Sequence, residues 1–189
     1  MATIGLKNLH VAKLTKDDKT GVTYDAPQRL ALAIEAKITP QVNSATLYAD
    51  DKAAEVVESL GEIEVELGID DLSSEMYAFL LGKTINSEGV IEDKSTDSAP
   101  YVALGFSMPL SKGGEKLVWL YKGKFQLPEE NAKTKGDNVE FQTPTIKAKF
   151  VPREYDDKWR ASVVTTDTGV DPTVIQNWFS AVYQETTTP

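Results

Sequence analysis

Three glutamates at regular spacing are the residues of this sequence with the clearest potential for chemistry. Glu62, Glu64 and Glu66 alternate with apolar residues, which predicts a strand with one carboxylate face and one apolar face. Neighbours on such a face lie near the spacing of about 5–10 Å that a glycosidase needs between its two carboxyl groups. Those pairs normally come from different segments around a cleft, and no aromatic sugar platform lies nearby. We therefore interpret the row as a solvated sheet face or, more sharply, as a surface that repels a negative partner.

The other candidate motifs are weaker. Gly82, Lys83 and Thr84 resemble the end of a phosphate-binding loop, but Tyr77 occupies the position of its first glycine, and the motif follows a helix. His10, the only histidine, alternates within a strand and is interpreted as an ordinary strand residue. The chain has no cysteine, which removes disulfides, thiolate nucleophiles and zinc–sulfur sites. We expect a protein that is not an enzyme and needs no metal or cofactor.

The acidic charge is concentrated in one stretch. The formal net charge is −9. Residues 50–75 contain ten carboxylates and a single cation, Lys52, so the rest of the chain is balanced. A negative protein does not bind tightly to a phosphate backbone, because that binding depends on cations that displace counterions.

A chain of 189 residues fits a single domain, 1–189, with a substantial core. No apolar run approaches the roughly 18 residues of a membrane helix, so we expect no membrane anchor. Residues 1–7 do not resemble a secretory signal or a basic presequence. We expect folding in a cytoplasm.

Periodicity predicts mostly strands, which should position these residues. Strands are expected at 6–14, 29–39, 101–108, 117–126, 139–151 and 159–166, and the acidic strand should end at 68–71. In the second of these, one face should carry Leu30, Leu32, Ile34, Ala36 and Ile38. Residues 40–51 break the pattern, and pairing should resume near 54–59.

Two helices are expected. Asp71 should cap the first, and Gly82 should end it. The second should begin with Asp171 and Pro172 and carry an apolar stripe of Val174, Ile175, Trp178, Phe179 and Val182. The chain is thus expected to be mainly β (α+β), an antiparallel sandwich or half-barrel with one internal helix and one C-terminal helix. The tail 185–189 should be frayed.

Segments along almost the whole chain resemble the major tail proteins of long-tailed bacteriophages (siphophages), of the type found in phages and prophages of Gram-positive bacteria. The likeness is carried, in order, by residues 1–9 (MATIGLKNL), 12–15 (AKLT), 21–24 (GVTY), 44–51 (SATLYADD), 60–63 (LGEI), 100–106 (PYVALGF), 118–125 (VWLYKGKF), 134–137 (TKGD), 139–144 (VEFQTP) and 177–183 (NWFSAVY).

This resemblance implies a structural virion protein. Its subunits would form hexameric rings whose sheets join into one barrel, and stacked rings would make the tube through which viral DNA leaves the capsid. The implied partners are further copies of the chain, a tape-measure protein, and tail initiator and tail terminator proteins; DNA would pass without specific binding. The implied location is the phage tail, assembled in the host cytoplasm.

In such proteins an extended loop between two strands reaches the neighbouring ring, and here it should be residues 40–52. Its candidate assembly residues are Ser44, Ala45, Thr46, Leu47, Tyr48, Asp50 and Asp51. If the flanking strands line the channel, the residues facing the lumen should be Glu35, Glu62, Glu64 and Glu66, which would coat it with negative charge.

Two alternatives remain open from the residues alone. A non-catalytic binding or decoration module built on a sandwich would be a monomer with an exposed aromatic patch. A hydrolase would use the acidic face and would place paired carboxyl groups in a cleft.

Overall fold

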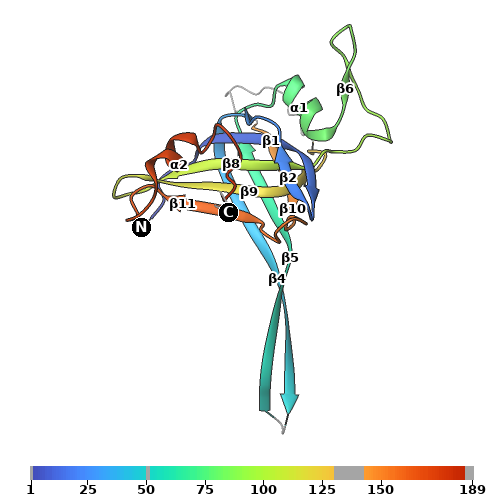
Figure 1. Ribbon diagram of the computed structural model, residues 1–189. Coiled ribbons are helices and arrows are strands. Elements are labelled where there is room, and N and C mark those ends of the chain that lie inside the picture. Colours follow the sequence, from blue (N-terminus) through green and yellow to red (C-terminus); the bar gives the residue numbers. More distant parts are fainter. Residues whose placement is uncertain (1, 50–51, 130–142, 186–189) are drawn as a thin grey trace, which may run out of the picture.

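A computed structural model describes residues 2–49, 52–129 and 143–185, and most of them lie in one large antiparallel sheet (Figure 1). The main β character expected from the sequence is confirmed. The nine-stranded sheet runs β2-β1-β8-β9-β10-β5-β4, with β3 beside β1 and β11 beside β9. Its strands are β1 (Lys7–Asp18), β2 (Gly21–Tyr24), β3 (Gln28–Arg29), β4 (Ala33–Ala49), β5 (Lys52–Ile69), β8 (Val102–Pro109), β9 (Glu115–Phe125), β10 (Thr145–Phe150) and β11 (Arg160–Val164). A separate hairpin joins β6 (Thr84–Ile85) and β7 (Ile91–Glu92).

The sheet curls around a first core. Residues of β1 and of β5, which lie four strands apart in the sheet, share one buried cluster, so the sheet bends as a half-barrel. Strand β9 makes this bend possible because its first half pairs with β11 and its end pairs with β10. The largest fully buried members of this core are Leu9, Ile63, Leu67, Ile69, Leu104, Phe106, Leu120 and Phe150.

A second core lies on the outer face of β1, β8 and β9, where helix α2 (Pro172–Asn177) and the segment after it cover the sheet (Figure 1). Trp119 is fully buried there, and its indole N–H donates to the carbonyl of Trp178 at 2.8 Å. Strand β8 is therefore buried on both faces from Val102 to Ser107. Trp178, expected on the apolar stripe of the C-terminal helix, is buried in this core.

The internal helix α1 (Ser74–Leu81) was correctly expected, but its cap was not. Ser73, rather than Asp71, is the N-cap, and its hydroxyl accepts from the backbone N–H of Met76 at 3.3 Å. Asp71 instead accepts from the N–H of Leu72. Gly82 ends the helix in the left-handed conformation, where an added Cβ would lie 2.2 Å from the carbonyl oxygen of Ser98.

The C-terminal helix begins as expected and ends early. Asp171 accepts from the N–H of Thr173, and Pro172 occupies the first turn. The helix stops at Asn177, so the expected stripe is completed by a bend that still buries Trp178 and Val182.

Glu185, the first residue of the tail expected to fray, makes an ion pair with the body of the chain. Glu185 is held by Lys158, whose ammonium nitrogen lies 2.9 Å from its carboxylate. Residues 186–189 lie outside the described part of the chain.

The expected alternation of strand 29–39 is wrong at its start. A bulge between Ala33 and Glu35 makes Ile34 the extra residue, so Ala33 and Ala36 pack on the core while Leu32 and Ile34 are more than half exposed. A bulge shifts every later side chain by one position, which periodicity alone does not reveal.

The strand expected at 139–151 is shorter in the structure. It starts at Thr145, directly after Pro144, whose carbonyl accepts from the N–H of Ile69. Residues 139–142 lie outside the described part of the chain.

Candidate assembly interface

The region expected as a loop is a long β-hairpin, which corrects the sequence interpretation. Strands β4 and β5 stay paired from Ala33 to the Ala49–Lys52 pair. The sequence interpretation took Pro40 as the end of the strand. Strand β4 lies at the edge of the sheet, where a proline whose nitrogen faces away from β5 removes no hydrogen bond between strands, so the strand continues through it. The resumed pairing expected near 54–59 is confirmed.

The outer half of this hairpin leaves the body, and we call residues 42–49 and 52–60 the arm. The neighbouring strand β10 pairs with β5 only as far as Ile63, so the arm has two strands alone. Eight residues of β4 at about 3.3 Å each extend it by roughly 25 Å. In Figure 1 the arm projects from one end of the body, while α1 and β6 lie at the opposite end.

The arm carries apolar side chains in contact with solvent. Tyr48 is 70% exposed, and Val56 and Val57 are each 58% exposed. Sequence reasoning placed Leu47 and Tyr48 among the assembly residues, but it missed the other large apolar residues of the arm: Val42, Val56, Val57 and Leu60. Five of the seven expected assembly residues are exposed on this arm: Ser44, Ala45, Thr46, Leu47 and Tyr48. Asp50 and Asp51 lie outside the described part of the chain.

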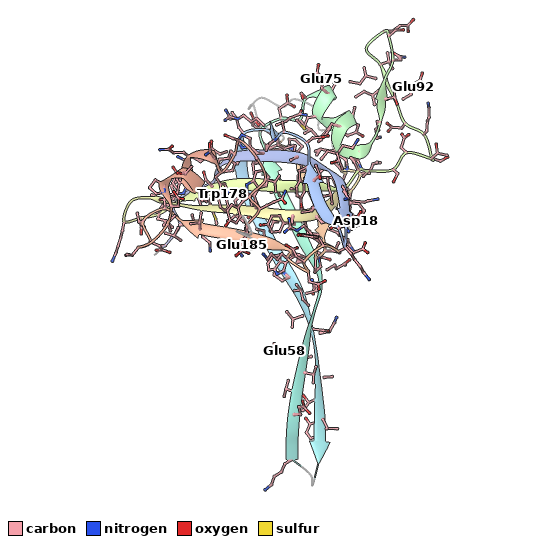
Figure 2. The ribbon with its side chains drawn as sticks, viewed as in Figure 1. Asp18, Glu58, Glu75, Glu92, Trp178 and Glu185 are labelled. Carbon is pink, nitrogen blue, oxygen red and sulfur yellow. The ribbon has the colours of Figure 1, made fainter. Side chains whose placement is uncertain are left out.

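The expected carboxylate row is present on the outer face of the sheet. Glu62, Glu64 and Glu66 point outward, and the residues between them are fully or almost fully buried. Glu35 opposes Gly68 at the adjoining end of β4 and is exposed. Figure 2 shows Glu58 further along the same hairpin, on the arm.

This face is not the negative surface that was expected. In β10, Lys147 directly opposes Glu66, and Lys149 opposes Glu64. The ammonium of Lys149 lies 2.6 Å from Glu62, and that hydrogen bond, together with the charge of Glu62, raises the pKa of Lys149. Lys147 and Lys37 flank Glu66 at 3.6 and 3.8 Å.

The lysine row extends to the next strand, where Lys124 of β9 opposes Lys149. Four carboxylates (Glu35, Glu62, Glu64 and Glu66) therefore share the face with four ammonium groups (Lys37, Lys124, Lys147 and Lys149). The lysines of β10 alternate in sequence just as the glutamates do. The alternation of these lysines is visible in the sequence, but the pairing of β10 with β5 is not.

A buried polar cluster joins β1 and β9 to the segment between β10 and β11. The carboxylate of Asp17 lies 2.6 Å from the ammonium of Lys122 and accepts from the N–H groups of Glu154 and Tyr155. Burial alone would raise the pKa of Asp17, but these partners outweigh it and the pKa lies below its usual value.

Arg153 continues the same cluster. Its guanidinium lies 3.8 Å from the ring centroid of Tyr121 and binds Asp156. Burial raises the pKa of the neighbouring Tyr24 to about 12, although Arg153 acts in the opposite direction. Each of these charges is paired within the chain, so the cluster stabilises the packing of β1 and β9 against the segment between β10 and β11.

A pocket with a volume of about 470 Å³ lies between the end of α1, the segment 93–99 and the end of β9. Lys83 lines it, but the side chain is 2% exposed and ion-paired with Asp93. Burial acts to lower the pKa of Lys83, but hydrogen bonds to Asp93 and Tyr77 outweigh it and raise the pKa above its usual value. The amine therefore stays charged, and a charged amine is not a nucleophile.

Groups of histidine, cysteine and carboxylate side chains that would hold a metal ion are also absent from the described ranges. His10 stacks on Phe179 with ring centroids 4.7 Å apart. Neither helix in the described part of the chain has the length and apolar character needed to span a bilayer.

No protein-family model matches the chain, and no curated protein is significantly similar to it in sequence.

Proposed function

We propose that the chain is the major tail tube subunit of a long-tailed bacteriophage, and that hexameric rings of it stack into the conduit for viral DNA. The observation that carries this proposal is the arm, which extends past the body and exposes apolar side chains that no described part of its own chain covers. An isolated two-stranded hairpin is marginally stable in water. A partner that covers the arm removes that weakness, and in a stacked tube the partner is the next ring.

Lateral contacts are supported by the edges of the sheet. Strand β4 is an uncovered edge, and next to its bulge it exposes Leu32 and Ile34, which are 56% and 54% accessible. Long open edges invite pairing with another chain. Contact between unlike edges of identical subunits is heterologous, and it generates a ring when the rotation closes.

The balanced sheet face changes how the channel is expected to work. If the outer face of β4, β5, β10 and the end of β9 lines the lumen, it presents a mixed row of charges to DNA instead of a uniformly negative coat. A wall without net charge neither releases counterions from DNA nor attracts it over long range. In this proposal, passage depends on the absence of net attraction.

Removal of the arm tests the proposal. In one variant, residues 42–60 are replaced by Asn-Gly, a two-residue connection suited to a hairpin. We expect the wild-type chain to form rings and tubes at high concentration, seen by negative-stain microscopy and sedimentation velocity. The shortened chain should unfold at nearly the same temperature, because the described arm side chains are exposed, and should stop at single rings.

Two outcomes would contradict this. A wild-type chain that stays monomeric at every concentration would favour the binding-module alternative, and tubes formed by the shortened chain would show that the arm does not join rings.

A further inference from the structure

We infer that each arm is clamped on both of its faces, each by a different copy of the chain, rather than laid along one surface of a single neighbour. This inference rests on the proposed function and concerns how the arm is received.

The register of the hairpin divides the arm into two faces. Directly opposed residues point to the same side, and successive residues point to opposite sides. We call one side the Val56 face; it carries Val42, Tyr48, Val56 and Leu60. The other side, the Val57 face, carries Ala45, Leu47 and Val57.

Both faces contain apolar cross-strand pairs. Val42 opposes Leu60 on the Val56 face, and Ala45 opposes Val57 on the Val57 face. A sheet covered on one side alternates apolar and polar residues, whereas strands covered on both sides carry apolar residues on both. The arm has the second pattern, although both of its faces are exposed in the single chain.

Each face of the arm also carries one glutamate. Glu58 lies on the Val56 face opposite Ser44, and Glu55 lies on the Val57 face opposite Leu47. Neither carboxylate forms an ion pair within the described residues, whereas Glu62 and Glu66 near the root of the arm do.

The body of the same chain offers matching cations. Lys13, Lys19 and Arg29 are exposed on β1, the turn after it and β3, and within the described ranges none of them contacts a carboxylate. Each face of the arm thus carries one carboxylate without an ion pair among the described residues, and the body carries exposed cations that can pair with it. This complementarity favours copies of this chain as the occupants.

Two copies are needed because of the geometry of a ribbon. A single smooth surface covers one face of a two-stranded ribbon and leaves the other in water. In a ring of identical subunits, each junction offers two walls that belong to different subunits. An arm inserted into that junction has both faces covered.

The absence of cysteine makes this testable with single labelled sites. Val56→Cys and Val57→Cys are a matched pair, because the two residues are adjacent, equally exposed and on opposite faces. Each variant is coupled to a benzophenone maleimide and illuminated in assembled tubes, and the cross-linked peptides are identified by mass spectrometry. The same labelled proteins, diluted to monomers, are the control.

We expect both sites to cross-link, each to a different surface of the body. The double variant Val56→Cys/Val57→Cys should yield covalent trimers. Cross-linking at only one site, capture of the same surface by both sites, or arm-to-arm products would overturn the inference and leave the proposed function standing. A wild-type chain that never assembles would contradict the proposed function itself.

Unlabelled variants guard against a label that blocks assembly. Val56→Ser and Val57→Ser should each raise the concentration for half-maximal tube formation roughly tenfold, because each loses one buried valine surface. Ser111→Ala, in the exposed turn between β8 and β9 and away from the arm, should change it little. If one of the two valine variants assembles like the wild type, its face is not covered.

Discussion

Asp17 shows how a single side chain can hold distant parts of the sheet together. Its carboxylate is almost completely buried, and it is bound by Lys122 of β9 and by two backbone N–H groups more than 130 residues away in sequence. Removing such a group leaves a buried ammonium and two donors without their partner.

The lowered pKa of Asp17 predicts an acid-sensitive contribution to stability. Because its pKa is lower in the folded chain than in the unfolded chain, the contribution is present above the unfolded pKa. It is lost as the pH falls through the folded pKa. Asp17→Asn should therefore lower the free energy of unfolding by about 2–3 kcal/mol at pH 7, and by less below pH ~3.

Urea unfolding at several pH values measures this difference. Asp25→Asn, which removes an exposed carboxylate, is the control. A difference between Asp17→Asn and the wild type that stays constant across pH would show that the carboxylate charge is not what matters.

At the scale of elements, helix α1 depends on a capping residue that sequence reasoning misplaced by two positions. Ser73 has the extended backbone of an N-cap, and its side chain bonds the N–H three residues on. Asp71 bonds only the N–H of the next residue. Both types of residue are good caps, so composition could not separate them.

The two substitutions should therefore differ. Ser73→Ala should lower the free energy of unfolding by about 1 kcal/mol, the usual cost of losing an N-cap, and Asp71→Ala should cost less. Thermal unfolding of the two variants checks this. Equal losses would mean that the aspartate also caps the helix.

At the scale of the whole molecule, the balanced outer face determines how the proposed tube treats DNA. Lysines from β4 and β10 neutralise a row of glutamates that looks purely repulsive in sequence. Each subunit of a ring repeats this face, so a small change of net charge is multiplied around the channel.

Reversal of the row tests this. Changing Glu62, Glu64 and Glu66 to Lys leaves the apolar face of β5 unchanged but surrounds Lys147 and Lys149 with like charge. Assembled tubes of this variant should retain DNA, with retention falling steeply as salt rises, and infectivity should drop. Changing Glu88 and Glu92 to Lys, in the β6–β7 hairpin and away from both this face and the arm, is the control for DNA retention. Reversed tubes that release DNA normally would place this face outside the channel.

Much of the local structure could be predicted from the sequence. Alternation in β5 identified its apolar and carboxylate faces, Gly82 marked the end of α1, and Asp171 with Pro172 marked the start of α2. These features depend on residues a few positions apart, and the backbone geometry that favours them is local. Leu47 and Tyr48 were also among the residues expected to take part in assembly, and both are exposed.

The arrangement of distant strands was decided only by the tertiary structure. Sequence periodicity did not reveal the bulge at Ile34, the continuation of β4 through Pro40, or the placement of Lys147 and Lys149 beside glutamates some 80 residues earlier. Strand pairing and register arise from contacts between segments far apart in the chain, and a shift of one residue reverses every later side chain. The sequence determined which faces were polar or apolar; the fold decided what those faces meet and left the arm without a partner among the described residues.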